Sequence, residues 1–122
     1  MSETQYKVII TPSAEAALED YDEYLRYELF ADQAADTWID AFEQEMVSLR
    51  TFPGKYQLVD REPWRRAGIR FHPVKGQNVY YWISEERRKV YIIDVIGQRM
   101  NQDKRLIESL IAFYQDLANG LK

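Results

Sequence analysis

The stretch that decides the fold is Val90-Tyr91-Ile92-Ile93-Asp94-Val95-Ile96, which is apolar at every position except Asp94. A short run so rich in β-branched and aromatic residues is typical of a central strand in a sheet. Burying a lone carboxylate in such a strand is costly, so we expect Asp94 to have a partner. The stretch therefore predicts a sheet built around residues 89–97.

Two further strands precede this one at short intervals. Residues 67–74 and 78–84 are also rich in β-branched and aromatic residues, and the connections between the three segments are Lys75-Gly76-Gln77 and Glu85-Glu86-Arg87-Arg88. Connections this short join antiparallel neighbours, so the three segments predict an antiparallel meander.

The N-terminal residues predict a strand that leads directly into a helix. Residues 5–10 alternate in hydrophobicity, and Thr11-Pro12 then supplies a helix N-cap and a proline at the first helical position. The expected buried stripe of this helix follows the i, i+3, i+4 spacing and comprises Ala14, Ala17, Leu18, Tyr21, Leu25 and Leu29.

Two more helices are predicted. Asp32 is expected to cap the second helix, which Phe52-Pro53-Gly54 ends. Its buried stripe comprises Ala35, Trp38, Ile39, Phe42, Met46 and Leu49. Residues 102–118 are expected to form the last helix, with Gly120 just past its end. The apolar stripe of that helix comprises Leu106, Ile107, Leu110, Ile111, Tyr114 and Leu117.

These elements define an α+β fold in the order β-α-α-β-β-β-α. The first two helices are joined by so few residues that they must fold back as an antiparallel hairpin, which packs on the antiparallel meander. The chain of 122 residues contains no repeat, low-complexity tract or linker, so we expect one domain over residues 1–122, with its core in residues 5–103.

Composition limits the functions that are open to the chain. There is no cysteine and only one histidine, so disulfides and thiolate zinc sites are excluded and we expect neither a metal nor a cofactor. Residues 1–5 are polar and show no signal peptide, and no apolar run approaches the roughly 18 residues of a membrane span. We therefore expect a soluble, cytoplasmic protein that does not associate with membranes.

Charge is segregated along the chain. Residues 1–62 carry 14 acidic against 5 basic residues, a balance of −9, and residues 63–122 carry 6 against 11, a balance of +5, which together give the net charge of −4. A local basic surface can attract phosphate even when the net charge is negative. The alternative is that the two halves are simply solvated faces of opposite sign.

Six segments, taken in order, carry a resemblance to a known family. They are Tyr6–Glu15 with a Pro-x-Ala-Glu turn, Asp20–Leu25, Leu49–Pro53, Glu62–Arg70, Val79–Ile83 and Val90–Arg99. On these segments, which span about residues 5–103, the chain resembles the RelE/ParE-type toxins of bacterial type II toxin–antitoxin (plasmid stabilisation) systems.

The resemblance implies a toxin that inhibits growth until a cognate antitoxin silences it. ParE-like members inhibit DNA gyrase, and the long helical hairpin and the Arg70-to-Tyr81 spacing resemble that branch. The alternatives are a RelE-like, ribosome-dependent mRNA endonuclease and a degenerate toxin fold that acts only as a binding module. A homodimer and a hetero-oligomer with the antitoxin both remain open.

If the chain is an enzyme, the resemblance implies a metal-independent endoribonuclease. Such cleavage needs a base, an acid and cations on one phosphate, and the candidates are Arg70, His72, Tyr81 and Arg99. Arg70 and His72 are two residues apart and therefore project from one face of their strand. We expect Arg70 and Arg99 to share one concavity of the sheet, roofed by the acidic hairpin.

Other interpretations of the same residues stay open. Asn78, Asp94, Gly97 and Asn101 replace residues that RelE-like members use, which weighs against catalysis. His72 suits a hydrogen-bonded strand histidine, and Arg99 suits an ion pair with Asp94 or Asp103. The candidate residues for binding a target or nucleic acid are Arg65, Arg66, Arg70, Arg99, Lys104 and Arg105. Beside Arg65, we expect Trp64 to be an exposed aromatic or a stacking platform for an arginine.

Overall fold

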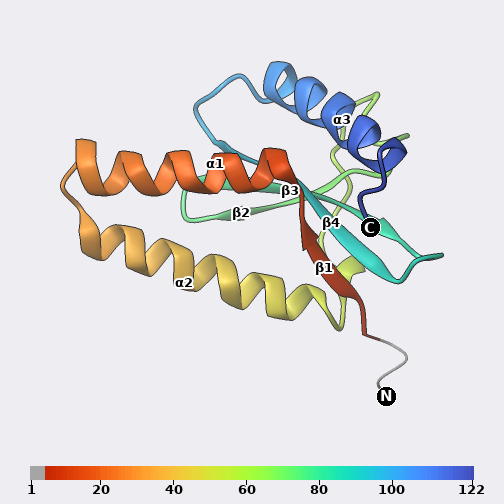
Figure 1. Cartoon of the computed structure of the whole chain (residues 1–122), viewed down its shortest axis with the longest axis horizontal. Coiled ribbons are helices and arrows are strands. Elements are labelled where there is room, and N and C mark those ends of the chain that lie inside the picture. Colours follow the sequence, from red (N-terminus) through yellow and green to blue (C-terminus); the bar gives the residue numbers. More distant parts are fainter. Residues whose placement is uncertain (1–4) are drawn as a thin grey trace.

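A mixed four-stranded sheet forms the centre of the computed structural model, which describes residues 5–122 (Figure 1). Its strands are β1 (Lys7–Ile10), β2 (Arg70–Val74), β3 (Gln77–Ser84) and β4 (Lys89–Gly97). Their spatial order is β1-β4-β3-β2, with β1 parallel to β4 and the other neighbours antiparallel. The predicted meander and the interior position of β4 are confirmed. Residues 1–4, part of the segment in which no signal peptide is expected, lie outside the described residues.

The second strand begins three residues later than its sequence pattern predicted. Gly68 has φ +82°, a conformation that a strand residue does not adopt, and a Cβ at this position would meet the Trp82 ring at 3.3 Å. The chain therefore turns at Gly68, and pairing in β2 starts at Arg70.

The helical hairpin consists of α1 (Pro12–Glu23), one π-helical turn, η2 (Tyr24–Glu28), and α2 (Asp32–Leu49). Thr11 caps α1 as predicted, because its hydroxyl accepts a hydrogen bond from Ala14 N at 3.3 Å; it also donates to the Ile92 carbonyl of β4 at 2.7 Å. The prediction that Asp32 caps α2 is wrong. Ala31 holds the cap position without a side-chain bond, and Asp32 is the first helical residue, where its charge still favours the helix N-terminus.

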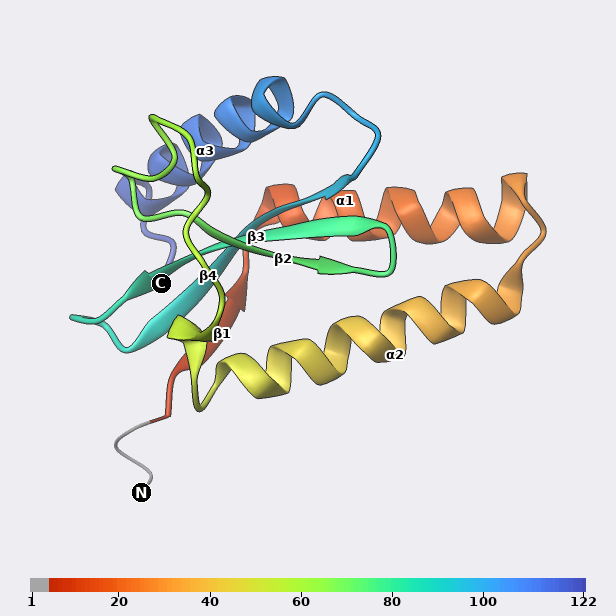
Figure 2. The same cartoon turned by 180° about the vertical axis from the view of Figure 1, so that it is seen from behind.

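The sheet separates two apolar cores (Figure 2). The hairpin covers one face, where Trp38 and Phe42 of α2 pack with Tyr81 and Ile92 of the sheet. On the other face, α3 (Gln102–Ala118) and the loop after the short helix η3 (Pro53–Lys55) pack on Tyr80, Tyr91 and Ile93.

The buried stripe of α3 differs from its prediction. Leu106, Leu110 and Phe113 face the sheet, whereas the side chains of Ile107, Ile111 and Tyr114 are exposed. The predicted stripe was wider than the helix face that a sheet can cover. Leu29, predicted to continue the stripe of the first helix, is also exposed, because the helix has ended at Glu28.

A β-bulge sets the direction of Asp94. Tyr80 pairs with Asp94 and Tyr81 with Ile92, so Ile93 is an extra residue in β4. Without the extra residue, alternation would turn Asp94 toward the hairpin. With it, Asp94 follows Ile93 onto the α3 face.

No helix within residues 5–122 has the length and apolar character needed to cross a membrane.

Candidate functional site

The two arginines expected in one site lie at opposite ends of the sheet. Arg70 at the start of β2 pairs with Tyr81, which pairs with Ile92. Arg99 follows Gly97, which is five residues beyond Ile92, a separation of roughly 15 Å along the strand. They line no common pocket among the described residues, so the prediction of a shared concavity is wrong.

Arg70 belongs to a cluster of polar side chains on the hairpin face of the sheet, here called the Glu45 cluster. Its members are Glu45 of α2, Lys55 and Tyr56 at the end of η3, and Arg70 and His72 of β2. The Tyr56 hydroxyl donates to Glu45 Oε1, Lys55 Nζ lies 3.5 Å from the same oxygen, and His72 Nε2 lies 3.7 Å from Glu45 Oε2. The rings of Tyr56 and His72 stack with centroids 3.7 Å apart. Three segments that are distant in sequence therefore meet on one carboxylate.

The cations of this cluster are already occupied. Arg70 Nη1 donates to the Tyr56 carbonyl at 2.6 Å, and Lys55 Nζ also contacts the Ser48 hydroxyl. Next to the cluster lies a shallow pocket of about 350 Å³ that Tyr56, Phe71 and His72 help to line. A phosphate entering this pocket would compete with bonds that hold the fold.

Burial is the largest cause of the pKa shift of each proton-transfer candidate on this face. Burial lowers the pKa of His72, Glu45 opposes this and Lys55 adds to it. Burial also raises the pKa of Tyr81 to about 12, with Arg70 opposing, and the Tyr81 hydroxyl donates to the Pro53 carbonyl at 2.6 Å. Burial and the bond to Glu45 raise the pKa of Tyr56 as well. Through their contacts with Glu45 and Pro53, the side chains of His72, Tyr56 and Tyr81 link α2, η3 and the sheet.

Arg99 lines a groove of about 710 Å³ at the far end of β4, here called the Arg99 groove. It is lined by residues of the first helix and its π-helical turn, the start of β3, the β4–α3 connection and α3, among them Tyr21, Tyr24, Gln77, Arg99, Met100 and Arg105. Arg99 is exposed, and no ion pair of Arg99 with Asp94 or Asp103 occurs in the described chain. Arg99 is thus available to a partner that enters the groove.

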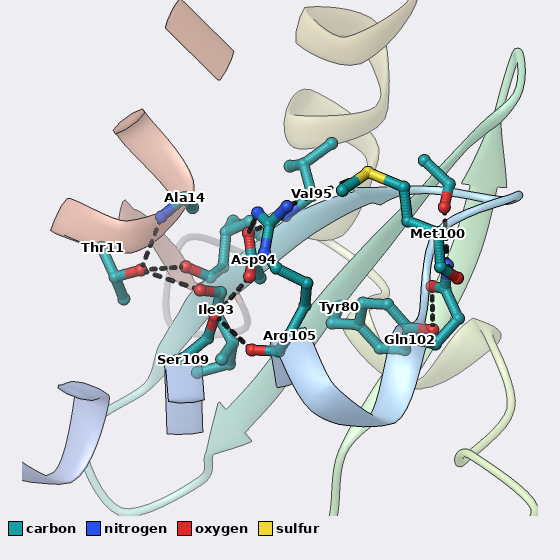
Figure 3. A network of polar contacts seen from close by, with 12 residues as sticks. Thr11, Ala14, Tyr80, Ile93, Asp94, Val95, Met100, Gln102, Arg105 and Ser109 are labelled. Carbon is teal, nitrogen blue, oxygen red and sulfur yellow. Dashed lines mark hydrogen bonds and ion pairs between the residues drawn. The ribbon is translucent and has the colours of Figure 1, made fainter. Parts of the chain in front are cut away.

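Asp94 lies beside this groove and is 1% exposed. Figure 3 shows its carboxylate next to Arg105 and Ser109 of α3. Its carboxylate accepts from Val95 N at 2.7 Å and from the Ser109 hydroxyl, and Arg105 Nη2 lies 3.4 Å away. Burial raises the pKa of Asp94, and the bonds from Ser109 and Arg105 oppose that rise. The expected partner of Asp94 is therefore present, and it is Arg105 rather than Arg99.

The remaining predicted cations are scattered over the surface. Arg65 is exposed and lies 3.5 Å from Asp60, Arg66 and Lys104 are exposed, and Arg105 is held by Asp94. The prediction of an exposed Trp64 is wrong. Trp64 is buried, and its indole N–H donates to Asp103 Oδ1 at 3.1 Å, where Arg61 also binds at 2.6 Å. Arg61 and Asp103 tie the loop before β2 to α3.

The sequence did not predict three residues that make key contacts in the Glu45 cluster and beside the Arg99 groove, namely Glu45, Tyr56 and Ser109. Glu45 and Tyr56 carry no local signal, because they meet His72 only after α2 and η3 have packed on β2. Ser109 could have been found: it lies four residues after Arg105 on α3, so both project from the same helix face toward a buried acid.

This architecture, with a hairpin and a third helix on opposite faces of a mixed sheet, is that of the RelE/ParE superfamily of toxins. Within that class, the chain belongs to the family described as the ParE toxin of the type II toxin–antitoxin system parDE, whose sequence model matches residues 8–102.

Two solved structures have the same fold. One is the chromosomal ParDE system of P. aeruginosa, with a TM-score of 0.59 and 15% identity over 77% of this chain and 97% of that chain. The other is the toxin–antitoxin complex RelBE2 of Mycobacterium tuberculosis, with a TM-score of 0.54 and 20% identity over 77% of this chain and 99% of that chain. Among curated proteins, none matches the chain significantly.

Proposed function

We propose that this toxin halts bacterial growth in the cytoplasm by binding DNA gyrase, and that a cognate antitoxin neutralises it. The observation that carries the proposal is the match of the ParE toxin family to residues 8–102. The two similar structures, described as a ParDE system and a toxin–antitoxin complex, support an antitoxin as partner.

The geometry favours binding over RNA cleavage. Metal-independent cleavage requires a base, an acid and cations that converge on one phosphate. Here Arg70 and Arg99 are at opposite ends of the sheet, and Arg70 and Tyr81 bond to backbone carbonyls. Arg105, the other cation that lines the Arg99 groove, is already paired with the buried Asp94. We therefore propose that Arg99 contacts a protein target rather than a phosphate of RNA.

Induction in a bacterial host tests the proposal. We expect growth arrest that co-expression of the neighbouring antitoxin gene relieves, and loss of supercoiling when the purified chain is added to purified gyrase. Arg99→Gln is expected to weaken inhibition about tenfold, as loss of an interface arginine can do. Lys7→Gln is the matched control, because Lys7 is an exposed cation on β1, away from the groove.

Two other outcomes of these experiments would support the alternative functions. Codon-positioned cuts in cellular mRNA, mapped by primer extension while gyrase stays active, would establish the endonuclease. Harmless expression together with tight antitoxin binding would establish a degenerate toxin that acts as a binding module.

A further inference from the structure

The closed end of the helical hairpin exposes a group of large apolar side chains. They are Tyr24 (47% exposed), Tyr27 (72%), Leu29 (51%) and Phe30 (85%), here called the tip. In both views the hairpin extends past the β2–β3 turn, so the tip stands clear of the sheet (Figures 1 and 2). Single exposed apolar residues are ordinary, but four within seven positions on a projecting end mark a contact surface.

The backbone of the tip is held in an unfavourable conformation. Phe30 has φ +50°, in the left-handed region that bulky residues avoid and glycine adopts freely. The turn before it, Tyr24–Glu28, is π-helical, a form that is frequent at functional sites. A glycine would make this turn with less strain, so the phenylalanine ring is not there to stabilise the turn.

The charge around the tip defines its partner. Residues 20–40, the half of the hairpin that ends in the tip, contain seven acidic residues and one basic residue, Arg26. Arg26 is held by two of those acids, at 3.0 Å from Asp22 and 2.6 Å from Asp36. Such a surface repels nucleic acid and anionic lipid, and it attracts a positively charged protein surface.

We propose that the tip docks into an apolar socket on a positively charged surface of the toxin's protein target, with Phe30 and Tyr27 as the inserted side chains. The inference rests on the proposed function, because it assigns the surface through which the toxin reaches its target. Aromatic anchors framed by complementary charge are typical of the few residues that dominate binding between proteins.

Two substitutions test the anchors. Phe30→Gly removes the ring and relieves the positive φ, so its thermal midpoint is expected to equal or exceed that of the parent chain. Growth arrest and inhibition of purified gyrase are nevertheless expected to weaken at least about tenfold, and likewise in Tyr27→Ser. Phe52→Ser is the matched control: Phe52 is 63% exposed, beyond the other end of α2, and its loss should leave both activities within about twofold.

Charge reversal tests the nature of the partner. Glu28→Lys at the tip should weaken growth arrest, and the effect should shrink at high salt in the gyrase assay. Glu108→Lys on α3 makes the same change in net charge away from the tip and should have no such effect. Stronger arrest by Glu28→Lys would mean an anionic partner and would overturn the proposal.

Failure of the docking proposal can be distinguished from failure of the proposed function. Equal arrest by the tip variants and by Phe52→Ser, in chains that fold alike, overturns the docking role and leaves the proposed function intact. An inactive parent chain overturns the proposed function, and the docking role with it. If growth arrests without gyrase inhibition, the target changes, and the ranking of the variants in growth still decides the role of the tip.

Discussion

The two faces of the sheet satisfy their charged groups in opposite ways. On the hairpin face, the Glu45 carboxylate is contacted by Tyr56, Lys55 and His72, which come from two other segments of the chain. This cluster is only partly buried. On the α3 face, Asp94 of the central strand is almost fully buried, and its one cationic partner among the described residues is Arg105 of α3. Water can replace a lost member of the first cluster, but it has little access to the second.

This difference bears on where function can reside. In both clusters, groups that could handle a phosphate instead join separate elements: Arg70 bonds to the Tyr56 carbonyl, and Arg105 bonds to Asp94. Within residues 5–122, Arg99 in its groove and the aromatic tip of the hairpin are peripheral groups that remain accessible to a partner. We therefore propose that partners are recognised at the edges of the molecule, while the charged groups at its centre stabilise the fold.

Removing the cation from the buried cluster should have the largest effect on stability. Arg105→Met leaves the Asp94 carboxylate buried without its positive partner, and we expect the free energy of unfolding at pH 7 to fall by about 3 kcal/mol. Urea denaturation measures this as a lower midpoint with an unchanged slope. Lys104→Met, an exposed neighbour on the same helix, should cost less than about 0.5 kcal/mol. Equal losses in the two variants would contradict the distinction between the clusters.

Two adjacent tyrosines compare the faces directly. The Tyr81 hydroxyl points to the hairpin face and donates to the buried Pro53 carbonyl, so Tyr81→Phe should cost about 1–2 kcal/mol. The Tyr80 hydroxyl points to the other face and donates at 2.7 Å to Gln102, whose side chain is less buried, so Tyr80→Phe should cost about half as much. Thermal or urea unfolding of both variants measures the difference, and a larger loss for Tyr80→Phe would reverse the comparison.

The sequence predicted most of the fold because its signals were local. The run at Val90–Ile96, the Thr11-Pro12 helix start and the short connections each specify their element without help from distant residues. The bulge at Ile93 could not be predicted, because an extra residue in β4 becomes visible only when its pairing with β3 is known. The direction of Asp94 depends on that one residue.

The candidate site was harder to predict, with one avoidable error. Arg70 and His72 do lie on one face, as their spacing requires, but the carboxylate beside them comes from α2. The pairing of Arg70 with Arg99 could have been rejected from topology alone. In a meander the first and third strands run in the same direction, so a residue that begins one and a residue that follows the other lie at opposite ends.

The two faces should also differ in their response to pH. Burial raises the pKa of Asp94, so the native state favours the protonated carboxyl; its contribution to stability is present below the unfolded value and is lost as pH rises through the folded pKa. Relative to Asp94→Asn, the parent chain should therefore lose stability as pH rises from about 4. Urea midpoints from pH 4 to pH 7 measure this trend.

Asp103 is the control of opposite sign. Arg61 and Trp64 lower the pKa of this exposed carboxyl, so its contribution is present above the unfolded value and is lost as pH falls. Relative to Asp103→Asn, the parent chain should gain stability as pH rises. The same trend for both aspartates would mean that burial does not govern Asp94.

The smallest expected effect is on the titration of His72, the single histidine of the chain. Burial and Lys55 lower its pKa while Glu45 raises it, so the NMR midpoint of its ring protons should lie below the ordinary value of about 6.5. Glu45→Gln should lower the midpoint further, and Lys55→Met should raise it. Because the folded pKa is depressed, the contribution of His72 to stability is present above pH 6.5 and is lost as pH falls through the folded value.

The opposite directions of these two variants make the test specific to the Glu45 cluster. If either substitution merely loosened the packing of α2 on β2, water would reach the imidazole and the midpoint would rise toward 6.5 in both. A downward shift in Glu45→Gln can therefore come only from loss of the carboxylate 3.7 Å from Nε2 in a cluster that stays packed. An upward shift in Glu45→Gln would mean that Glu45 holds the helix on the sheet and that its charge is secondary.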